Sequence, residues 1–304
     1  MGYNSRSGKT GVKGSHWEGQ LMDSRGPLED VPKAMTDRAN SPYKVWYEDF
    51  AEQAADAQIG TMGFTVTDIN TPTSPTETIL PENRALFLNP GSKVDSGIEL
   101  QFNIPSTAAS LGSTFKIMGE FLQTTTLMDG QEIFFQTRIG SVSNSATDND
   151  SKYIIGFFQN DASLLASATG VPSVVAGGGF GFHKGELGAV TCLSTNAAIT
   201  AAGTACVPAV SELAMTVNVP NWHVYAARCR VIDADAGTGV TDFWYDNVHR
   251  LRLTTIPFDA TDTHSFSIGL LNGPTQIADM HIDYILTGIT RPGLTWPYTN
   301  GVIY

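Results

Sequence analysis

Three aromatic residues in the second half of the sequence are of a type that could bind a sugar ring. Trp222, Trp244 and Tyr245 lie in stretches where apolar and polar residues alternate. An aromatic ring can stack on the apolar face of a sugar, and nearby polar groups can bind the sugar hydroxyls. These three residues are therefore candidate glycan-stacking residues. The alternative is that they pack in the core or at its rim, which is the commoner role of aromatic residues in strands.

Carboxylates at a spacing suited to catalysis are hard to find in the sequence. Retaining glycosidases place two carboxylates about 5 Å apart, and a Glu-x-Asp-x-x-Glu pattern on a strand would provide such a pair. That pattern and its near variants are not found. Asp233 and Asp235 are two residues apart, but they stand in a Gly-rich turn that is typical of a solvated loop. We therefore expect no catalytic residue and no enzyme activity.

Metal and cofactor sites are equally weakly supported. The six histidines show no His-x-x-x-His spacing, which a zinc site on a helix would require. Calcium could bind the carboxylates of 148–150 or 233–235, but neither stretch has a defined calcium-loop pattern. The glycines of 177–181 lack the Gly-Lys-Ser/Thr ending of a phosphate-binding loop. The sequence predicts no metal site and no cofactor.

The candidate aromatic residues must be positioned by strands, because the residues around them alternate with a period of two. The stretch 221–233 predicts a strand with Cys229 and Val231 facing the core and Arg228 and Arg230 pointing outward. Turn residues then separate further predicted strands, and together they form an antiparallel meander. These strands cover residues 240–246, 248–256, 264–271 and 280–289.

The first half of the chain has the same rhythm of short strands and turn formers. A first strand is predicted at 43–50, and others follow at 60–69, 78–88, 97–104, 114–122, 131–139 and 153–159. Gly, Pro, Asn and Asp separate them, and no stretch shows a convincing helical period. The sequence predicts an all-β protein built as a two-sheet antiparallel sandwich.

Several of these features together resemble a known superfamily. A Trp opens a long strand, a later strand ends in Tyr245-Asp246, and residues 282–285 read Ile-Asp-Tyr-Ile. This arrangement looks like the second half of a concanavalin A-like β-sandwich, and the resemblance covers about residues 46–290. It implies two packed antiparallel sheets with jelly-roll connections. The superfamily includes lectins, glycosidases and bacteriophage structural proteins, so the resemblance implies a fold and leaves the function open.

The N-terminal segment 1–44 differs from the remainder of the chain. It holds seven basic and five acidic residues, a net charge of +2, and the chain total of −12 leaves −14 for the rest. Few large apolar residues are present, so the segment is predicted to be an extended arm that a partner holds. The predicted partner-binding residues of the arm are Arg6, Lys9, Lys13, Trp17, Arg25, Lys33 and Arg38.

The sandwich domain is predicted at 45–291, followed by a C-terminal tail at 292–304. Residues 161–211 are rich in Gly, Ala and Ser and are predicted to form a long loop insertion with two short strands, at 180–183 and 187–193. Three cysteines are present. Cys229 is expected to be a small buried residue, and a bridge between Cys192 and Cys206 is an open alternative.

Charge and composition exclude some classes of partner. A net charge of −12 argues against direct nucleic-acid binding, which needs clustered Lys and Arg. The sequence contains no run of 18 apolar residues and no signal-peptide pattern, so no membrane contact is expected.

These features favour a non-enzymatic structural protein of a virion, most simply a phage capsid decoration or minor capsid protein. Its arm would hold it on the major capsid protein or other virion subunits at the capsid surface, as a homo-oligomer or symmetric array. The first alternative is a carbohydrate-binding module or appendage protein for cell-surface glycan. The second alternative is a sandwich-fold glycoside hydrolase or lyase.

Overall fold

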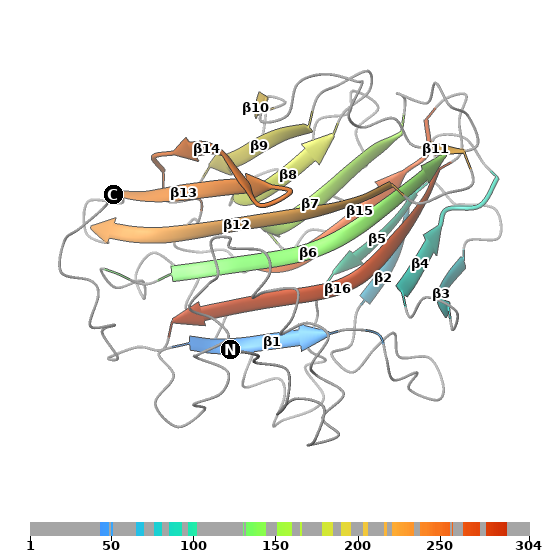
Figure 1. Cartoon of the computed structure of the whole chain (residues 1–304), viewed down its shortest axis with the longest axis horizontal. Helices are drawn as coiled ribbons and strands as arrows, with labels where there is room; N and C mark the ends of the chain where they lie inside the picture. The colour runs from blue at the N-terminus through green and yellow to red at the C-terminus, as the bar shows by residue number, and fades with distance from the viewer. Residues whose placement is uncertain are drawn as a thin grey trace, which may run out of the picture.

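The computed structural model describes residues 43–48, 50, 65–69, 76–80, 85–92, 97–101, 130, 132–143, 151–159, 165, 178–184, 190–195, 203–205, 216–217, 221–233, 238–255, 257, 264–273 and 278–290. These residues form strands and the turns next to them, and they include no helix. The strands form two sheets that lie one behind the other (Figure 1).

The larger sheet has nine strands, and its long central strands run side by side across the molecule (Figure 1). In spatial order its main path is β14 (Val248–Leu253), β13 (Thr238–Tyr245), β12 (Asn221–Asp233), β6 (Glu132–Ser143), β16 (Ala278–Thr290), β4 (Ala85–Asn89) and β3 (Thr76–Leu80). Two further strands lie off this path. β1 (Tyr43–Glu48) pairs antiparallel with β16, and the short β11 (Thr216–Val217) pairs parallel with β6.

The smaller sheet has seven strands, and all its pairings are antiparallel. Its order is β10 (Thr204–Ala205), β9 (Val190–Thr195), β8 (Gly179–Lys184), β7 (Lys152–Gln159), β15 (His264–Leu271), β5 (Gly97–Gln101) and β2 (Thr65–Ile69). The predicted all-β, two-sheet sandwich is therefore confirmed. Among the described strands, β11 makes the one parallel pairing, and every other pairing is antiparallel.

The core lies between the two sheets and is built from alternate residues of long strands such as β6, β12 and β15. Phe135 of β6 is at its centre, with its ring 5.2–6.3 Å from four other phenylalanine rings. Those rings belong to Phe157, Phe180, Phe182 and Phe266, all at most 1% exposed. On β12 the buried positions include Cys229 and Val231, whereas Arg228 and Arg230 are partly exposed. The predicted orientation of this strand is confirmed.

A second apolar cluster covers the face of the smaller sheet that points away from the core. It contains Ile154, Phe158, Leu165, Leu193 and Leu271. The Phe158 ring lies against glycines of β7 and β8, where a Cβ would clash. A Cβ on Gly181 would come 2.2 Å from the Ile155 carbonyl oxygen, with the Phe158 ring at 2.9 Å. Glycine is therefore required here because two backbones and a ring approach closely.

Two sequence expectations differ from the structure. The single strand predicted at 78–88 is a hairpin of β3 and β4, in which Leu80 pairs with Ala85. Within 161–211, expected to be a long loop with two short strands, the described residues form three strands, and β8 among them is fully buried. The strand predicted at 114–122 lies outside the described residues.

Candidate ligand-binding face of the larger sheet

The larger sheet turns one face toward the core and the other, here called the outer face, away from it. Trp222 lies on the outer face at the start of β12. Its partner on β6 is Gly140, which is in turn the partner of His281 on β16. Because Gly140 has no side chain, Trp222 and His281 meet across it, with ring centroids 6.2 Å apart and planes at 72°.

Arg138 completes the surroundings of Trp222. Its guanidinium carbon lies 4.8 Å from the centroid of the indole, a distance typical of a cation–π contact. Its Nη1 donates to Asp283 Oδ2 at 3.0 Å. We call Trp222, Arg138, His281 and Asp283 the Trp222 cluster. It joins residues of three adjacent strands and is partly exposed, since 36% of the Arg138 side chain is open to solvent.

A similar group of residues surrounds Trp244 on β13. The His249 ring meets the Trp244 indole edge-on, at 5.3 Å and 74°, and the Arg228 guanidinium lies 5.8 Å from its centroid. His249 Nε2 is 2.8 Å from Asp242 Oδ1. We call Trp244, Arg228, His249 and Asp242 the Trp244 cluster. Each cluster thus contains one Trp, one Arg, one His and one Asp.

Asp242 holds the Trp244 cluster rigid. Arg252 donates two hydrogen bonds to the Asp242 carboxylate, from Nε to Oδ1 at 2.7 Å and from Nη2 to Oδ2 at 2.9 Å. Burial alone would raise the pKa of Asp242, but the hydrogen bonds and charges of Arg252 and His249 lower it below its usual value. The carboxylate therefore stays ionised, and its planar partners are fixed before any ligand binds.

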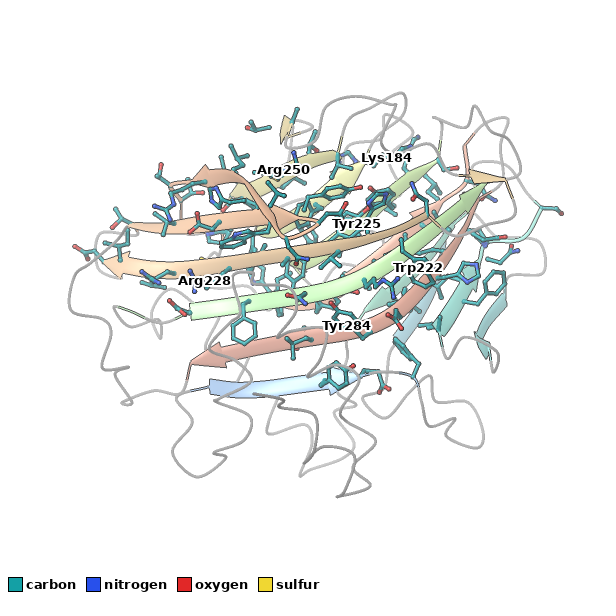
Figure 2. All side chains as sticks on the ribbon, in the orientation of Figure 1. Lys184, Trp222, Tyr225, Arg228, Arg250 and Tyr284 are labelled. Carbon is teal, nitrogen blue, oxygen red and sulfur yellow. The ribbon has the colours of Figure 1, made fainter. Side chains whose placement is uncertain are left out.

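The region between β6 and β16 is more deeply buried. Gln136 Nε2 donates to the Tyr284 hydroxyl at 2.7 Å, and Thr137 Oγ1 donates to the Tyr284 carbonyl oxygen at 2.6 Å. Burial raises the pKa of Tyr284 far above its usual value. Gln136 Oε1 is buried without a hydrogen-bond partner among the described residues. Figure 2 shows Tyr284 on β16, with Trp222 and Arg228 far apart along β12.

Asp279 is a further residue of the outer face that the sequence patterns missed. Its neighbours Ala278 and Met280 are in the core, so Asp279 points the other way, like His281 and Asp283. Burial raises the pKa of Asp279 to about 6. Its Oδ1 has no hydrogen-bond partner in the described part of the chain. Only a search for Asp-x-His-x-Asp on one strand face would have found it.

The structure separates the three predicted stacking residues. Trp222 and Trp244 lie on the outer face and are partly exposed. Tyr245 is 1% exposed in the core, where its ring stacks on His223 at 4.9 Å, so its predicted role is wrong. Neighbouring residues of a strand point to opposite faces, and Trp244 already takes the outer one. The predicted arm residues, from Arg6 to Arg38, lie outside the described residues.

Other candidate sites are not formed by the residues that the structure describes. They contain no group of three or more His, Cys, Asp or Glu residues that could hold a metal ion. Cys192 and Cys229 are buried, and Cys206 lies outside the described residues, so a bridge between Cys192 and Cys206 stays an open alternative. Across the same residues, no helix is long and apolar enough to span a membrane.

No protein-family model and no curated protein matches the sequence. Solved structures are similar at low identity. Peanut lectin with a nonapeptide has a TM-score of 0.46 and 10% identity, covering 82% of this chain and 97% of the lectin. A point mutant of the Emp46p carbohydrate recognition domain has a TM-score of 0.48 and 10% identity, with coverages of 79% and 93%. Endo-1,3-beta-glucanase from Streptomyces sioyaensis has a TM-score of 0.44 and 12% identity, with coverages of 83% and 98%.

The fold class depends on the strand pairing of the chain itself. Two packed sheets with antiparallel main paths confirm the predicted two-sheet β-sandwich. Similarity at these TM-scores carries no argument about function, and the similar structures include both lectins and a glucanase. Function must be argued from the outer face.

Proposed function

We propose that the chain is a non-enzymatic glycan-binding sandwich that uses the outer face of its larger sheet. The observation that carries the proposal is the pair of Trp-centred clusters. A pyranose ring has an apolar face of C–H groups and a rim of hydroxyls. The indole suits the first, and the fixed Arg and Asp side chains suit the second, because they supply donors and acceptors in known directions.

The absence of an enzymatic role is part of the proposal. Hydrolysis of a glycosidic bond needs a proton donor beside a second carboxylate. Three outer-face carboxylates are bound by arginine: Asp283 by Arg138, Asp242 by Arg252, and Glu132 by Arg230, whose Nε lies 2.7 Å from Glu132 Oε1. Despite burial, Arg252 and His249 lower the pKa of Asp242, so Asp242 stays ionised and unable to give a proton. Burial raises the pKa of Asp279 to about 6, so Asp279 is the candidate acid of this face.

The proposal is tested by electrophoresis of the full chain through gels that contain single neutral polysaccharides. We expect at least one β-glucan to retard it, and the double variant Trp222→Met, Trp244→Met to migrate freely. The same mixtures are assayed for new reducing ends. Release of reducing ends that Asp279→Asn abolishes would replace the binding role with a hydrolase. Free migration in every gel would rule out glycan binding.

A second candidate function is the virion structural protein predicted from the sequence, and one observation favours it. Tyr43 at the start of β1 pairs with Thr290 at the end of β16. The arm and the C-terminal tail therefore join the sandwich at the same end of one sheet. The 42 residues before Tyr43 could reach about 140 Å if extended. Their basic residues suit an acidic neighbouring subunit, such as the acidic body of another copy.

This second function is tested by co-sedimentation with virus shells that lack the protein. We expect the full chain to saturate the shells at a fixed ratio, and a chain starting at Pro42 to stay in the supernatant. Equal binding of both chains would show that the arm does not anchor the protein to the shell. A chain that binds glycan and also saturates shells would be a virion appendage protein, so the two functions are compatible.

A further inference from the structure

The centre of the outer face is buried, although it points away from the core. Phe134 of β6 is 1% exposed and Leu286 of β16 is 0% exposed. Ile133 and Phe135 on either side of Phe134 are in the core, and so is Ile285 before Leu286. Neighbouring residues of a strand point to opposite faces, so Phe134 and Leu286 point outward. Neither belongs to a core cluster of the described residues, so something other than the core keeps water from them.

The neighbours of Phe134 within the sheet cannot hide its ring. Phe134 pairs with Arg228 on one side, and on the other side with Gly288, which has no side chain. All the described strands belong to the two sheets, and the smaller sheet packs against the opposite face of the larger one (Figure 1). An uncovered ring beside a glycine would be wetted by solvent. A further segment of polypeptide must therefore cover it.

We call Phe134, Gln136, Tyr284 and Leu286 the covered patch, and each of them is at most 2% exposed. The patch is mainly apolar, but Gln136 Oε1 is buried without a hydrogen-bond partner among the described residues. A buried oxygen of this kind needs a donor. An extended peptide can supply a backbone N–H while its apolar side chains cover the rings. The patch therefore suits an extended segment that carries a few apolar residues.

The N-terminal arm enters the sandwich beside the covered patch. It ends where β1 begins, and Tyr47 of β1 pairs with Leu286. Phe134 is two strands away from β1, because its partner Gly288 pairs with Val45. Two strand spacings amount to about 10 Å. The 15 residues from 28 to 42, which lie outside the described residues, could span about 50 Å if extended. The last part of the arm is therefore long enough to cover the patch.

The sequence of residues 28–42 fits this role. Leu28, Val31 and Met35 are three of the few large apolar residues of the arm, and all three are close enough to Tyr43 to reach the patch. The two prolines of this stretch disfavour a helix and favour an extended backbone. Such a backbone leaves its N–H groups available for an acceptor such as Gln136 Oε1.

We propose that residues 28–42 fold back over the outer face of their own sandwich and cover the patch with Leu28, Val31 and Met35. This inference does not depend on glycan binding. It divides the arm into two parts, because residues 1–27, with most of the basic residues, stay available for an acidic neighbouring subunit. It also confines any ligand of the outer face to the partly exposed Trp-centred clusters on either side of the patch.

The test is hydroxyl-radical footprinting with residue-level mass spectrometry, which reports the exposure of single aromatic side chains. The full chain is compared with a chain starting at Pro42. We expect oxidation of Phe134 to rise several-fold when the arm is removed. Phe135, its neighbour in the core, is the internal control and should stay protected in both chains. Adding a peptide of residues 1–41 to the shortened chain should restore the protection of Phe134.

A second variant keeps the full length of the arm. The triple variant Leu28→Ser, Val31→Ser, Met35→Ser should expose Phe134 as removal of the arm does, because the apolar contacts are lost. Leu21→Ser, a matched change in the part of the arm that does not dock, should leave Phe134 protected. If Phe135 were also oxidised in the shortened chain, the sandwich itself would have opened, and the triple variant would decide.

Two results would overturn the inference. Protection of Phe134 in the shortened chain or in the triple variant would show that another segment covers the patch. Protection of the full chain that is lost on dilution would assign the cover to the arm of a second copy. Neither result affects retardation by polysaccharide gels, so failure of this inference is distinct from failure of the glycan-binding function.

Discussion

Asp279 is the residue whose ionisation should affect stability most directly near neutral pH. Burial raises its pKa from 3.8 to about 6. The folded state therefore holds the proton more tightly than the unfolded state. Its stabilising effect is complete below about pH 4 and is lost as the pH rises through 6. Asp279→Asn should be more stable than the parent chain at pH 7 and equal to it below pH 4, measured by urea unfolding.

Asp242 provides the opposite case on the same sheet face. Its pKa is lowered, because the hydrogen bonds and charges of Arg252 and His249 outweigh the effect of burial. Its contribution is present at neutral pH and is lost as the pH falls through that lowered pKa. Asp242→Asn should cost about 1–2 kcal/mol at pH 7, and the loss should shrink in acid. If Asp279→Asn and Asp242→Asn both raised, or both lowered, the free energy of unfolding at pH 7 relative to the parent chain, this assignment would be contradicted.

Cysteine accessibility is a second test at the residue scale. Cys192 and Cys229 are at most 1% exposed, and burial raises the pKa of the Cys229 thiol to about 12 despite a hydrogen bond with Thr241. A thiol reacts as its thiolate. In a titration with a chromogenic disulfide reagent at pH 8, Cys229 should react only after the chain unfolds, and the variant Cys229→Ala should lose that late-reacting thiol. Reaction of Cys229 in the native chain would show that this core opens.

Among the elements, the pair β7 and β8 depends on glycine. A Cβ on Gly181 would meet the Ile155 carbonyl oxygen and the Phe158 ring. Gly181→Ala should destabilise the chain by about 2 kcal/mol, because neither backbone can move without disturbing the core. Val248→Ala, at a 51% exposed position on β14, is the control and should change little. A Gly181→Ala chain as stable as the control would mean that the two strands can separate at no cost.

The elements also show how far the sequence could predict the fold. Alternation on β12 gave the correct facing of Cys229 and Arg228, because a strand with one buried face leaves a period of two. Tyr245 was misplaced because the local pattern does not decide which of two adjacent aromatic residues faces outward. The turn at Asp246 and Asn247, both with positive φ, fixes the register so that Trp244 faces out and Tyr245 faces in.

The outer face was harder to predict, since its residues come from strands far apart in the sequence. Trp222 and Trp244 could be chosen from local pattern alone. Their partners could not, because Arg138, His281 and Asp283 join Trp222 only through the order β12-β6-β16. Asp279 was missed because the carboxylate pattern considered, Glu-x-Asp-x-x-Glu, does not match the Asp-x-His-x-Asp sequence of residues 279–283.

At the scale of the whole molecule, the position of β1 has a consequence for synthesis. The first described strand of the chain pairs along its full length with the last, from Tyr43 opposite Thr290 to Glu48 opposite Ile285. On the ribosome, residues 43–48 are made long before their partners exist. The edge of β16 that pairs with β1 therefore closes only after residues 285–290 have emerged. Until then β1 has no partner strand to pair with, so we expect folding to be slow and sensitive to chaperones.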